Sequence, residues 1–308
     1  MSESGWSAEI SLSCDYSAPV IDLHAHSNRS DGKDSPTELV ENAKAAGVSV
    51  LAITDHDTTS GWDEAILAGR RNGVRIIPGI EVSTRQQVDK DRSISVHILA
   101  YLPDPTHAEL AAELEKTRNS RISRAQKMVD LLAEDYPIQW EQVLAELPEG
   151  STVGRPAIAD ALVTLGIVPT RSDAFTSILH SKSRYYVSDH AMPTERAIEL
   201  IRKAGGVSVI AHPLIDFPPG ASFSDLPAQF FAGLIRAGLD GIEVNHRAVP
   251  ARAKDWLRNL SIKHQLIVTG SSDYHGVGGK DNLLGENQTS PEMLQRILDQ
   301  ASGFEAPL

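Results

Sequence analysis

The sequence lacks the features that would place it in several large classes of protein. It has a single cysteine, Cys14, so an internal disulfide framework and a metal site built from thiolates are both excluded. No apolar run approaches the roughly 20 residues that a membrane-spanning helix needs, and the stretch before Cys14 contains neither Lys nor Arg. We therefore expect a cytoplasmic protein without a membrane span or a signal peptide.

The chain also lacks net positive charge, because 41 acidic residues outweigh 29 basic ones and give a net charge of −12. This balance argues against a broad basic surface of the kind that coats nucleic acid. An anionic substrate would need strictly local positive charge, which bound metal ions can supply. With 41% hydrophobic residues, the chain can bury a substantial core in one large or two modest domains. Nothing in the composition indicates an obligate protein partner.

From Val20 onward, short β-branched runs alternate with amphipathic stretches of helical period. This alternation is typical of βα units on a largely parallel sheet. Ser35-Pro36 and Gly47 mark the start and end of the first connecting helix. The predicted strands are Val20–Leu23, Val48–Ile53, Arg75–Ile80, Ser95–Tyr101, Val207–Ile210, Gly241–Val244 and Leu266–Thr269.

The segment 104–193 departs from this rhythm. It is rich in Ala, Leu, Glu, Arg and Lys at helical spacing, and it has almost no strand-like run before Tyr185-Tyr186-Val187. We predict a helical insertion that caps one face of an α/β barrel. The predicted organisation is an N-terminal tail, a first barrel part, the insertion and a second barrel part, at residues 1–19, 20–103, 104–193 and 194–308.

Metal-competent side chains recur at the predicted strands. A lone His-x-His pair is more often a packing or surface feature, so the repetition carries the argument. In parallel α/β sheets and barrels, active sites form at the C-terminal ends of the strands. His107, His180, His190 and His264 fall outside this pattern and are interpreted as ordinary surface or helix residues. The groups that follow it are His24, His26, Asp55, His56, Asp57, Glu81, His97, His212, His246, Asp273 and His275.

Nitrogen and carboxylate ligands without sulfur suit Zn, Mn or Fe in the +2 state, and their number is too high for one four-coordinate ion. We therefore predict two or three divalent metal ions. Glu81 is the only Glu among the strand-end groups early in the chain, which makes it the candidate bridging and catalytic carboxylate. A water molecule that bridges such ions would be deprotonated near neutral pH and become a hydroxide nucleophile.

These motifs resemble the polymerase and histidinol phosphatase (PHP) superfamily of metal-dependent phosphoesterases. The resemblance implies a distorted seven-stranded (β/α)7 barrel, and the helical insertion is similar to that of the subgroup acting on nucleoside 3′,5′-bisphosphates and on 5′ ends of short RNA. The matching stretches are Asp22-Leu23-His24-Ala25-His26, Thr54-Asp55-His56-Asp57, Gly79-Ile80-Glu81-Val82-Ser83, Val96-His97-Ile98-Leu99, Ala211-His212-Pro213 and Gly270-Ser271-Ser272-Asp273-Tyr274-His275.

The same resemblance implies three metal sites. Many relatives carry a histidine where this chain has Asp31, a difference that bears on the occupancy of the third site. The implied ligands are His24, His26, Glu81 and Asp273 for the first ion, Glu81, His97 and His212 for the second, and Asp31, His56 and His275 for the third.

Other residues are candidates for the phosphate side of the reaction. Asp57 or His246 is expected to protonate the leaving oxygen, although Asp57 is also a candidate for orienting a metal ligand, and His246 for touching the substrate. Arg155 is the first candidate for gripping a second phosphate, because a guanidinium can do so through two hydrogen bonds. Lys182 and Arg184 are weaker candidates for the same role.

The basic residues Arg118, Arg121, Arg124 and Lys127 recur every three residues on a predicted helix. We interpret them as a solvated face balanced by neighbouring Glu residues, in preference to a nucleic-acid stripe.

We expect a phosphomonoesterase that acts on a small-molecule nucleotide, with a nucleoside 3′,5′-bisphosphate converted to a nucleoside monophosphate plus phosphate. The expected reaction is attack on phosphorus by a metal-held hydroxide. Two other enzymatic hypotheses remain open: the protein is a 5′-3′ exonuclease on short RNA, or it is a histidinol phosphatase. A catalytically silent domain that only binds metal or nucleotide is the alternative from another class. The retention of the ligand positions argues against it.

Overall fold

The structure, a computed structural model, describes residues 18–88, 93–147, 153–180, 182–187, 191–213 and 228–305. The predicted N-terminal tail, with Cys14, falls almost wholly outside these residues, and so does His190. Within the described ranges, no helix is long and apolar enough to cross a membrane.

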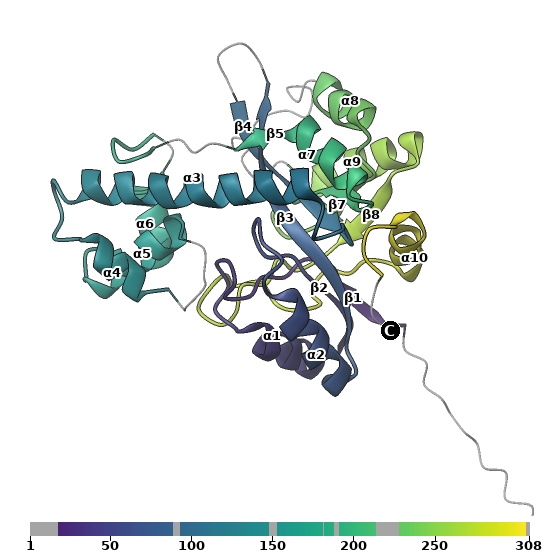
Figure 1. The fold of residues 1–308 in the computed structure, drawn as a ribbon, viewed down its shortest axis with the longest axis horizontal. Coiled ribbons are helices and arrows are strands. Elements are labelled where there is room, and N and C mark those ends of the chain that lie inside the picture. Colours follow the sequence, from purple (N-terminus) through teal and green to yellow (C-terminus); the bar gives the residue numbers. More distant parts are fainter. Residues whose placement is uncertain are drawn as a thin grey trace, which may run out of the picture.

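Strands and helices alternate along most of the chain (Figure 1). The strands are β1 (Val20–Asp22), β2 (Val48–Ile53), β3 (Arg75–Gln87), β4 (Ser93–Tyr101), β5 (Met192–Pro193), β6 (Val207–Ile210), β7 (Gly241–Asn245) and β8 (Ile267–Gly270). The helices are α1 (Pro36–Ala45), α2 (Trp62–Asn72), α3 (Ala108–Leu132), α4 (Trp140–Ala145), α5 (Arg155–Thr164), α6 (Arg171–Ser177), α7 (Thr194–Lys203), α8 (Ala228–Ala237), α9 (Ala251–His264) and α10 (Pro291–Gln300).

Local sequence explains where the first helices begin and end. The Ser35 side chain accepts a hydrogen bond from the Glu38 backbone N–H, and the Glu38 carboxylate accepts one from the Ser35 N–H, which caps α1 reciprocally. Pro36 occupies the first turn, where no donor is lost. Helix α2 ends at Gly73, whose φ of 67° places it in the left-handed region that glycine tolerates. The predicted first connecting helix is therefore confirmed, within about two residues at its end.

One sheet organises the barrel, in the strand order β1-β2-β3-β4-β6-β7-β8, with β5 paired to β3. Its two ends meet beyond β1 and β8, because an isolated bridge joins Ala25 to Tyr274. Backbone hydrogen bonds of 2.8 Å from His26 N to Tyr274 O and 2.9 Å from Asp273 N to His24 O accompany this bridge. The fold is the expected α/β class, a distorted barrel whose first and last strands approach each other at the predicted ligands.

The expectation that every strand reaches the site from its C-terminal end is wrong for β4. This strand runs antiparallel to both β3 and β6. The physical reason is that β3 and β4 form a long hairpin with nine paired positions, so the chain returns along its own path. His97, which pairs with Ser83, therefore enters the site from within its strand and not from a strand end.

The segment predicted as an insertion carries helices α3 to α6, which lie to one side of the barrel in Figure 1. Tyr185-Tyr186-Val187, the strand-like run of the sequence, forms turn and irregular structure, and β5 begins only at Met192. Hydrophobicity and β-branching alone did not distinguish a strand from an aromatic contact within the helical segment.

Helix α3 belongs to two hydrophobic cores. Leu110 and Leu114, near its start, pack in the cluster that lies between the barrel strands and their helices. Met128, Val129 and Leu132, near its end, pack in a separate cluster with α4, α5 and α6. Figure 1 shows α3 as the long helix that runs from the barrel to the other helices of the insertion. One rigid helix thus connects the insertion to the barrel mouth.

Candidate metal centre and substrate cavity

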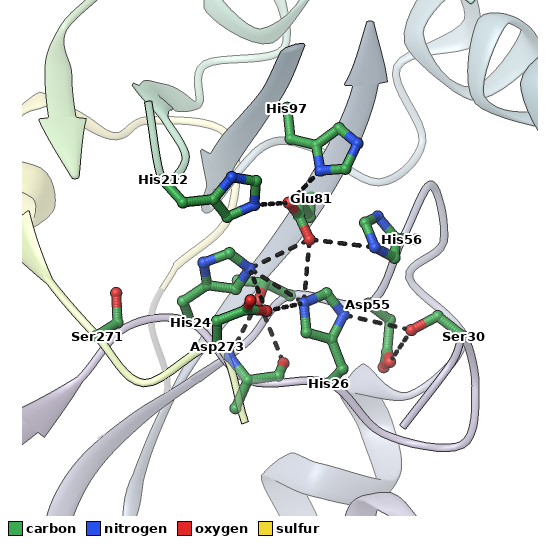
Figure 2. Close-up of polar contacts among 12 residues, drawn as sticks. His24, His26, Ser30, Asp55, His56, Glu81, His97, His212, Ser271 and Asp273 are labelled. Atoms are coloured by element: carbon green, nitrogen blue, oxygen red, sulfur yellow. Dashed lines mark hydrogen bonds and ion pairs between the residues drawn. The ribbon is translucent and has the colours of Figure 1, made fainter. Parts of the chain in front are cut away.

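The histidines and carboxylates that sequence analysis singled out converge in one buried place, although they come from segments up to 251 residues apart (His24 to His275). Figure 2 shows Glu81 at the centre, with His97 and His212 on one side and His24, His26 and His56 on the other. His24 and His26 have no exposed surface, and Glu81 is 1% exposed. The cluster is therefore assembled from residues that follow strand ends together with Glu81 and His97, which lie within β3 and β4.

The two oxygens of the Glu81 carboxylate face different sets of imidazoles. Oε1 lies 2.6 Å from His97 Nδ1 and 3.0 Å from His212 Nε2. Oε2 lies at 3.0, 3.1 and 3.4 Å from the Nε2 atoms of His26, His24 and His56. A carboxylate with one oxygen toward each set has the geometry expected of a bridge between two ions.

Asp273 and Asp31 complete the set of candidate ligands. Asp273 Oδ1 lies 3.3 Å from His26 Nε2 and 3.5 Å from His24 Nε2. Asp31 Oδ1 lies 3.3 Å from His275 Nε2, and its Oδ2 lies 3.9 Å from His56 Nε2. In the described chain, three groups bring their ligand atoms within 4.8 Å of one another: His24, His26, Glu81 and Asp273; His56, Glu81 and His97; and His26, Asp31, His56 and His275.

The chemistry of these atoms fits divalent cations. Nε2 of His24 and Nε2 of His26 lie 3.0 Å apart and close to the same Glu81 oxygen. These three atoms can all accept hydrogen bonds, and too few hydrogen-bond donors lie among them to satisfy all three. Three buried atoms of the cluster, Asp273 Oδ1, His275 Nε2 and His56 Nδ1, have no hydrogen-bond partner among the described residues. Buried polar atoms left in this way are costly unless a ligand satisfies them. The nitrogen and oxygen donor set suits Zn, Mn or Fe.

Charge in the cluster is strongly negative. Burial alone would raise the pKa values of Asp31, Glu81 and Asp273, but nearby imidazoles, and Lys280 beside Asp273, hold them well below the usual range. Burial would lower the pKa of His24, yet the surrounding carboxylates raise it well above its ordinary value. The same negative field that would protonate this histidine favours a metal cation in its place.

Backbone strain concentrates at the cluster. Five non-glycine residues of the described chain have positive φ, and three of them are Asp57 (55°), His212 (24°) and Asp273 (56°). Such conformations cost on the order of 1–3 kcal/mol each and persist where the surroundings enforce them. Their position at three loops around one cluster is typical of a functional site.

Glu243 is a supporting carboxylate that sequence analysis did not single out. It is fully buried, and its Oε1 lies 3.1 Å from His24 Nδ1 while its Oε2 accepts the His212 backbone N–H at 2.6 Å. Burial would raise the pKa of Glu243, but His24 and the neighbouring imidazoles lower it to about 2. An acceptor at Nδ1 fixes the His24 tautomer so that Nε2 points its lone pair into the cluster. The sequence feature that could have identified Glu243 is an acidic residue within the otherwise apolar strand β7.

A cavity of about 1070 Å³ opens from this cluster toward the insertion. His56, His97, Asp31 and His275 line its inner end, and residues of α3, α5 and α6 line the other. The described lining residues include two acidic side chains, Asp31 and Asp281, against several basic ones. The basic lining residues are Arg85, Arg121, Arg124, Arg155, Arg171, Arg247 and Lys280. Strong local positive charge thus exists inside an acidic protein, as an anionic substrate requires.

The interpretation of the four basic residues of α3 as a solvated face is wrong for the three arginines. Arg118 donates to the Asp57 carbonyl, and Arg121 lies 3.0 Å from Asp57 Oδ2. Arg124 donates to the Val187 carbonyl at 2.6 Å. The side of α3 that bears them faces the barrel loops and the cavity, because the helix packs across the barrel mouth. Lys127 is exposed, as expected.

The predicted phosphate-side residues fall in different places. The Arg155 guanidinium lines the cavity, 5.5 Å from the Phe175 ring centre and 5.7 Å from that of Tyr186. Lys182 and Arg184 are exposed and are not among the described residues of the cavity lining, and Arg184 pairs with Asp135.

The two candidate proton donors lie behind the cavity surface. Asp57 is fully buried, and its Oδ1 accepts the Ser83 backbone N–H at 2.7 Å. His246 is 1% exposed, with Nε2 3.6 Å from Asp273 Oδ2 and Nδ1 accepting the Ala248 N–H at 3.1 Å. Lys280, which sequence analysis missed, does line the cavity and donates to Asp273 Oδ2 at 2.6 Å. Lys280 lies in a glycine-rich loop, and the sequence around it does not indicate a role at the site.

Several known proteins are similar to this chain. The family model of the PHP domain matches residues 22–146. The chain is 34% identical over 255 residues to a 5′-3′ exoribonuclease from Haemophilus influenzae, covering 82% of this chain and 89% of that protein. It is 33% identical over 283 residues to a 3′,5′-nucleoside bisphosphate phosphatase from Chromobacterium violaceum, covering 90% and 94%. A crystal structure from Bifidobacterium adolescentis, assigned as a metal-dependent phosphoesterase, is 40% identical, with a TM-score of 0.85 over 93% of this chain and 98% of that one.

Proposed function

The chain belongs to the PHP family of metal-dependent phosphoesterases, and from that premise we propose that it hydrolyses a phosphomonoester of a nucleotide, with a nucleoside 3′,5′-bisphosphate as the preferred substrate. One observation carries this proposal. The carboxylate cluster around Glu81 opens into a cavity whose described lining is rich in Arg and Lys. A substrate with one phosphate at the cluster and a second one farther along the cavity would complement both ends.

We assign the metal ligands as the family resemblance implies them. The first set is His24, His26, Glu81 and Asp273. The third set is Asp31, His56 and His275, which lie in one group with His26. When bound, two or three divalent ions of Mn, Zn or Fe supply Lewis-acid activation of the phosphate and of the attacking water. The second set is Glu81, His97 and His212, whose ring nitrogens lie within 3.0 Å of Glu81 Oε1.

The protein's own residues position the substrate and the ligands. Arg155 is proposed to hold the second phosphate, because its guanidinium contacts two aromatic rings at the insertion end of the cavity, which restrict its position before the substrate arrives. His246 Nδ1 accepts a hydrogen bond from the Ala248 N–H, and the other ring nitrogen, Nε2, lies 3.6 Å from Asp273 Oδ2. Lys280 donates to the same carboxylate from the cavity side. His246 and Lys280 are thus proposed to orient Asp273.

The decisive experiment is an assay of purified, manganese-loaded protein on adenosine 3′,5′-bisphosphate, with phosphate and nucleotide products both quantified. We expect one phosphate released per nucleotide and accumulation of the nucleoside monophosphate. Binding of the bisphosphate without any phosphate release would instead support a catalytically silent domain. Faster turnover of histidinol phosphate than of the bisphosphate would indicate that the substrate is not a nucleotide.

A 5′-3′ exonuclease on short RNA is the second candidate, favoured by the size of the cavity. A volume of about 1070 Å³ lies at the upper end of the range that encloses small ligands, and it leaves room beyond one nucleotide. A 5′-phosphorylated oligoribonucleotide, tested beside the bisphosphate, separates the two activities. Mononucleotide products with a higher kcat/KM than the bisphosphate reaction would make the exonuclease the main activity.

A further inference from the structure

We propose that Arg121, on the inserted helix α3, is a phosphate-binding residue of the active site, and that buried Asp57 is the positioning residue that holds its guanidinium at the edge of the metal cluster. This inference deepens the proposed function and rests on its phosphomonoester chemistry. It gives the insertion a part in the reaction centre itself, in addition to the distal phosphate contact of Arg155.

The contacts of Arg121 tie it to the loops that carry two metal-ligand candidates. Its Nη2 lies 3.0 Å from Asp57 Oδ2, as a charge contact, and donates to the Ser83 hydroxyl. Asp57 directly follows His56, and Ser83 is two residues beyond Glu81 on the same strand. The guanidinium is therefore placed by the same backbone that places these ligands.

Asp57 itself is held rigidly. Its φ of 55° is in the left-handed region, its Oδ1 accepts the Ser83 N–H at 2.7 Å, and its carbonyl accepts a hydrogen bond from Arg118. A fully buried carboxylate needs a partner charge, and Arg121 provides it. This arrangement explains why an aspartate stands at a strained position behind the cavity surface, where it cannot itself reach a substrate.

Arg121 nevertheless faces the cavity. Its side chain is 16% exposed, and it lines the cavity together with His56 and His97. A guanidinium has five N–H donors in a planar fork, so contacts through Nη2 leave other donors for a phosphate oxygen. Because its anchors are already in place, little conformational entropy is lost when the phosphate binds.

Arg118 offers a matched comparison on the same helix, one turn earlier. It also contacts Asp57, but it is not among the described residues of the cavity lining. Substituting each arginine by glutamine separates a contact with the substrate from a contact that only supports the loop. Lys116, which is 58% exposed and pairs with Glu113, serves as a control outside both networks.

The first test uses p-nitrophenyl phosphate, a generic phosphomonoester, with manganese-loaded protein of verified metal content. We expect R121Q to lower kcat/KM by about 100-fold, the size typical of removing one donor to transition-state charge, with metal content unchanged. R118Q should lower it by less than about fivefold, and K116Q should match the wild type, because neither touches the phosphate. Equal losses in R118Q and R121Q, or loss of metal in R121Q alone, would overturn the proposal.

Two further measurements exclude a merely structural effect. Added guanidinium, at a concentration that leaves the wild type unaffected, should restore part of the activity of R121G and none of that of R118G. With metal-free protein, which cannot turn the substrate over, ligand-observed NMR should show weaker binding of p-nitrophenyl phosphate to R121Q than to R118Q. Absence of both effects would contradict a direct phosphate contact.

The role of Asp57 is tested by a double-mutant cycle. If Asp57 acts through Arg121, D57N lowers kcat/KM about tenfold in the wild type and adds little in the R121Q background. Independent, multiplying losses would refute the coupling. If the wild type hydrolyses p-nitrophenyl phosphate but no nucleotide, the proposed function fails while the Arg121 result stands. If it hydrolyses the bisphosphate but R121Q is fully active on both substrates, only the present inference fails.

Discussion

The two ends of the cavity are built in different ways. At the barrel end, buried side chains from many strands meet within hydrogen-bonding distance of one carboxylate, and charge is negative. At the insertion end, partly exposed arginines are held by aromatic rings and backbone carbonyls, and charge is positive. The barrel end thus has the properties of a site for cations, and the insertion end those of a site for the anionic remainder of a substrate. The comparison teaches that the two charge environments of one cavity come mainly from different parts of the chain.

The strongest test of this difference between the two ends is to remove the central carboxylate, Glu81. We expect E81A to lower phosphate release by at least about a thousandfold, because the loss of metal activation removes several kcal/mol of transition-state stabilisation. Elemental analysis should show that metal content falls as well. E115A, which alters an exposed glutamate of α3, is the matched control and should resemble the wild type. Intact phosphate release in E81A would refute the assignment of the barrel end as the reaction centre.

A second substitution tests whether the barrel end depends on carboxylates behind the ligands. We expect E243Q to weaken metal affinity about 10- to 100-fold, the range typical for residues that orient a metal-bound histidine. The reason is that Glu243 faces His24 Nδ1 and accepts the His212 N–H, so it supports ligands on both sides of Glu81. Competition with a chelator measures the affinity, with E292Q, at an exposed position of α10, as the control. Unchanged affinity would mean that packing alone orients these rings.

The sequence predicted the barrel end well because its signal is local. Each candidate ligand except Asp31 stands within a short apolar run or a few residues beyond its end, so the pattern is visible before any tertiary contact is known. Asp31 follows no apolar run and was implied only by the family resemblance. The direction of β4 was not predictable in this way, since a run such as Ser95–Tyr101 reads the same in either direction along a sheet. Glu243 had a weak signal, as a charged residue in a buried strand, that alternation of side chains would have assigned to the barrel interior.

The insertion end was predicted poorly for a physical reason. An arginine at helical spacing has the same sequence pattern whether it faces water or a neighbouring loop, so Arg118 and Arg121 were assigned to solvent. Only the packing of α3 across the barrel mouth decides between the two. Lys280 likewise depends on a loop that returns to Asp273, and seven residues of sequence separation gave no indication of that contact.

A third substitution sharpens the comparison at the insertion end. We expect R155Q to lower kcat/KM for adenosine 3′,5′-bisphosphate by about 10- to 100-fold, since hydrogen bonds to a charged group contribute about 1.5–3 kcal/mol each. Turnover of a substrate with a single phosphate, such as p-nitrophenyl phosphate, should change little. R184Q is the matched control, because Arg184 is exposed and paired with Asp135 outside the described cavity lining. An equal loss on both substrates would contradict a role for Arg155 in binding a second phosphate.

The smallest expected effect concerns the contact that joins the two ends at the surface. Lys33 Nζ lies 2.7 Å from Asp160 Oδ2, which links the loop after Asp31 to helix α5, but Arg171 already holds the same carboxylate at 2.7 Å through Nε. An ion pair with a side chain that is 36% exposed contributes on the order of 0–1 kcal/mol. We therefore expect K33M to change kcat/KM by less than about threefold.

The matched comparison for K33M is L114A, which removes apolar contact between α3 and the barrel and should cost about 2–5 kcal/mol of stability. Denaturant unfolding of both variants measures the difference. If K33M proved as disruptive as L114A, the insertion would be held in place by surface charge. If only L114A is disruptive, the packing of α3 is what brings the basic end of the cavity to the metal-binding end.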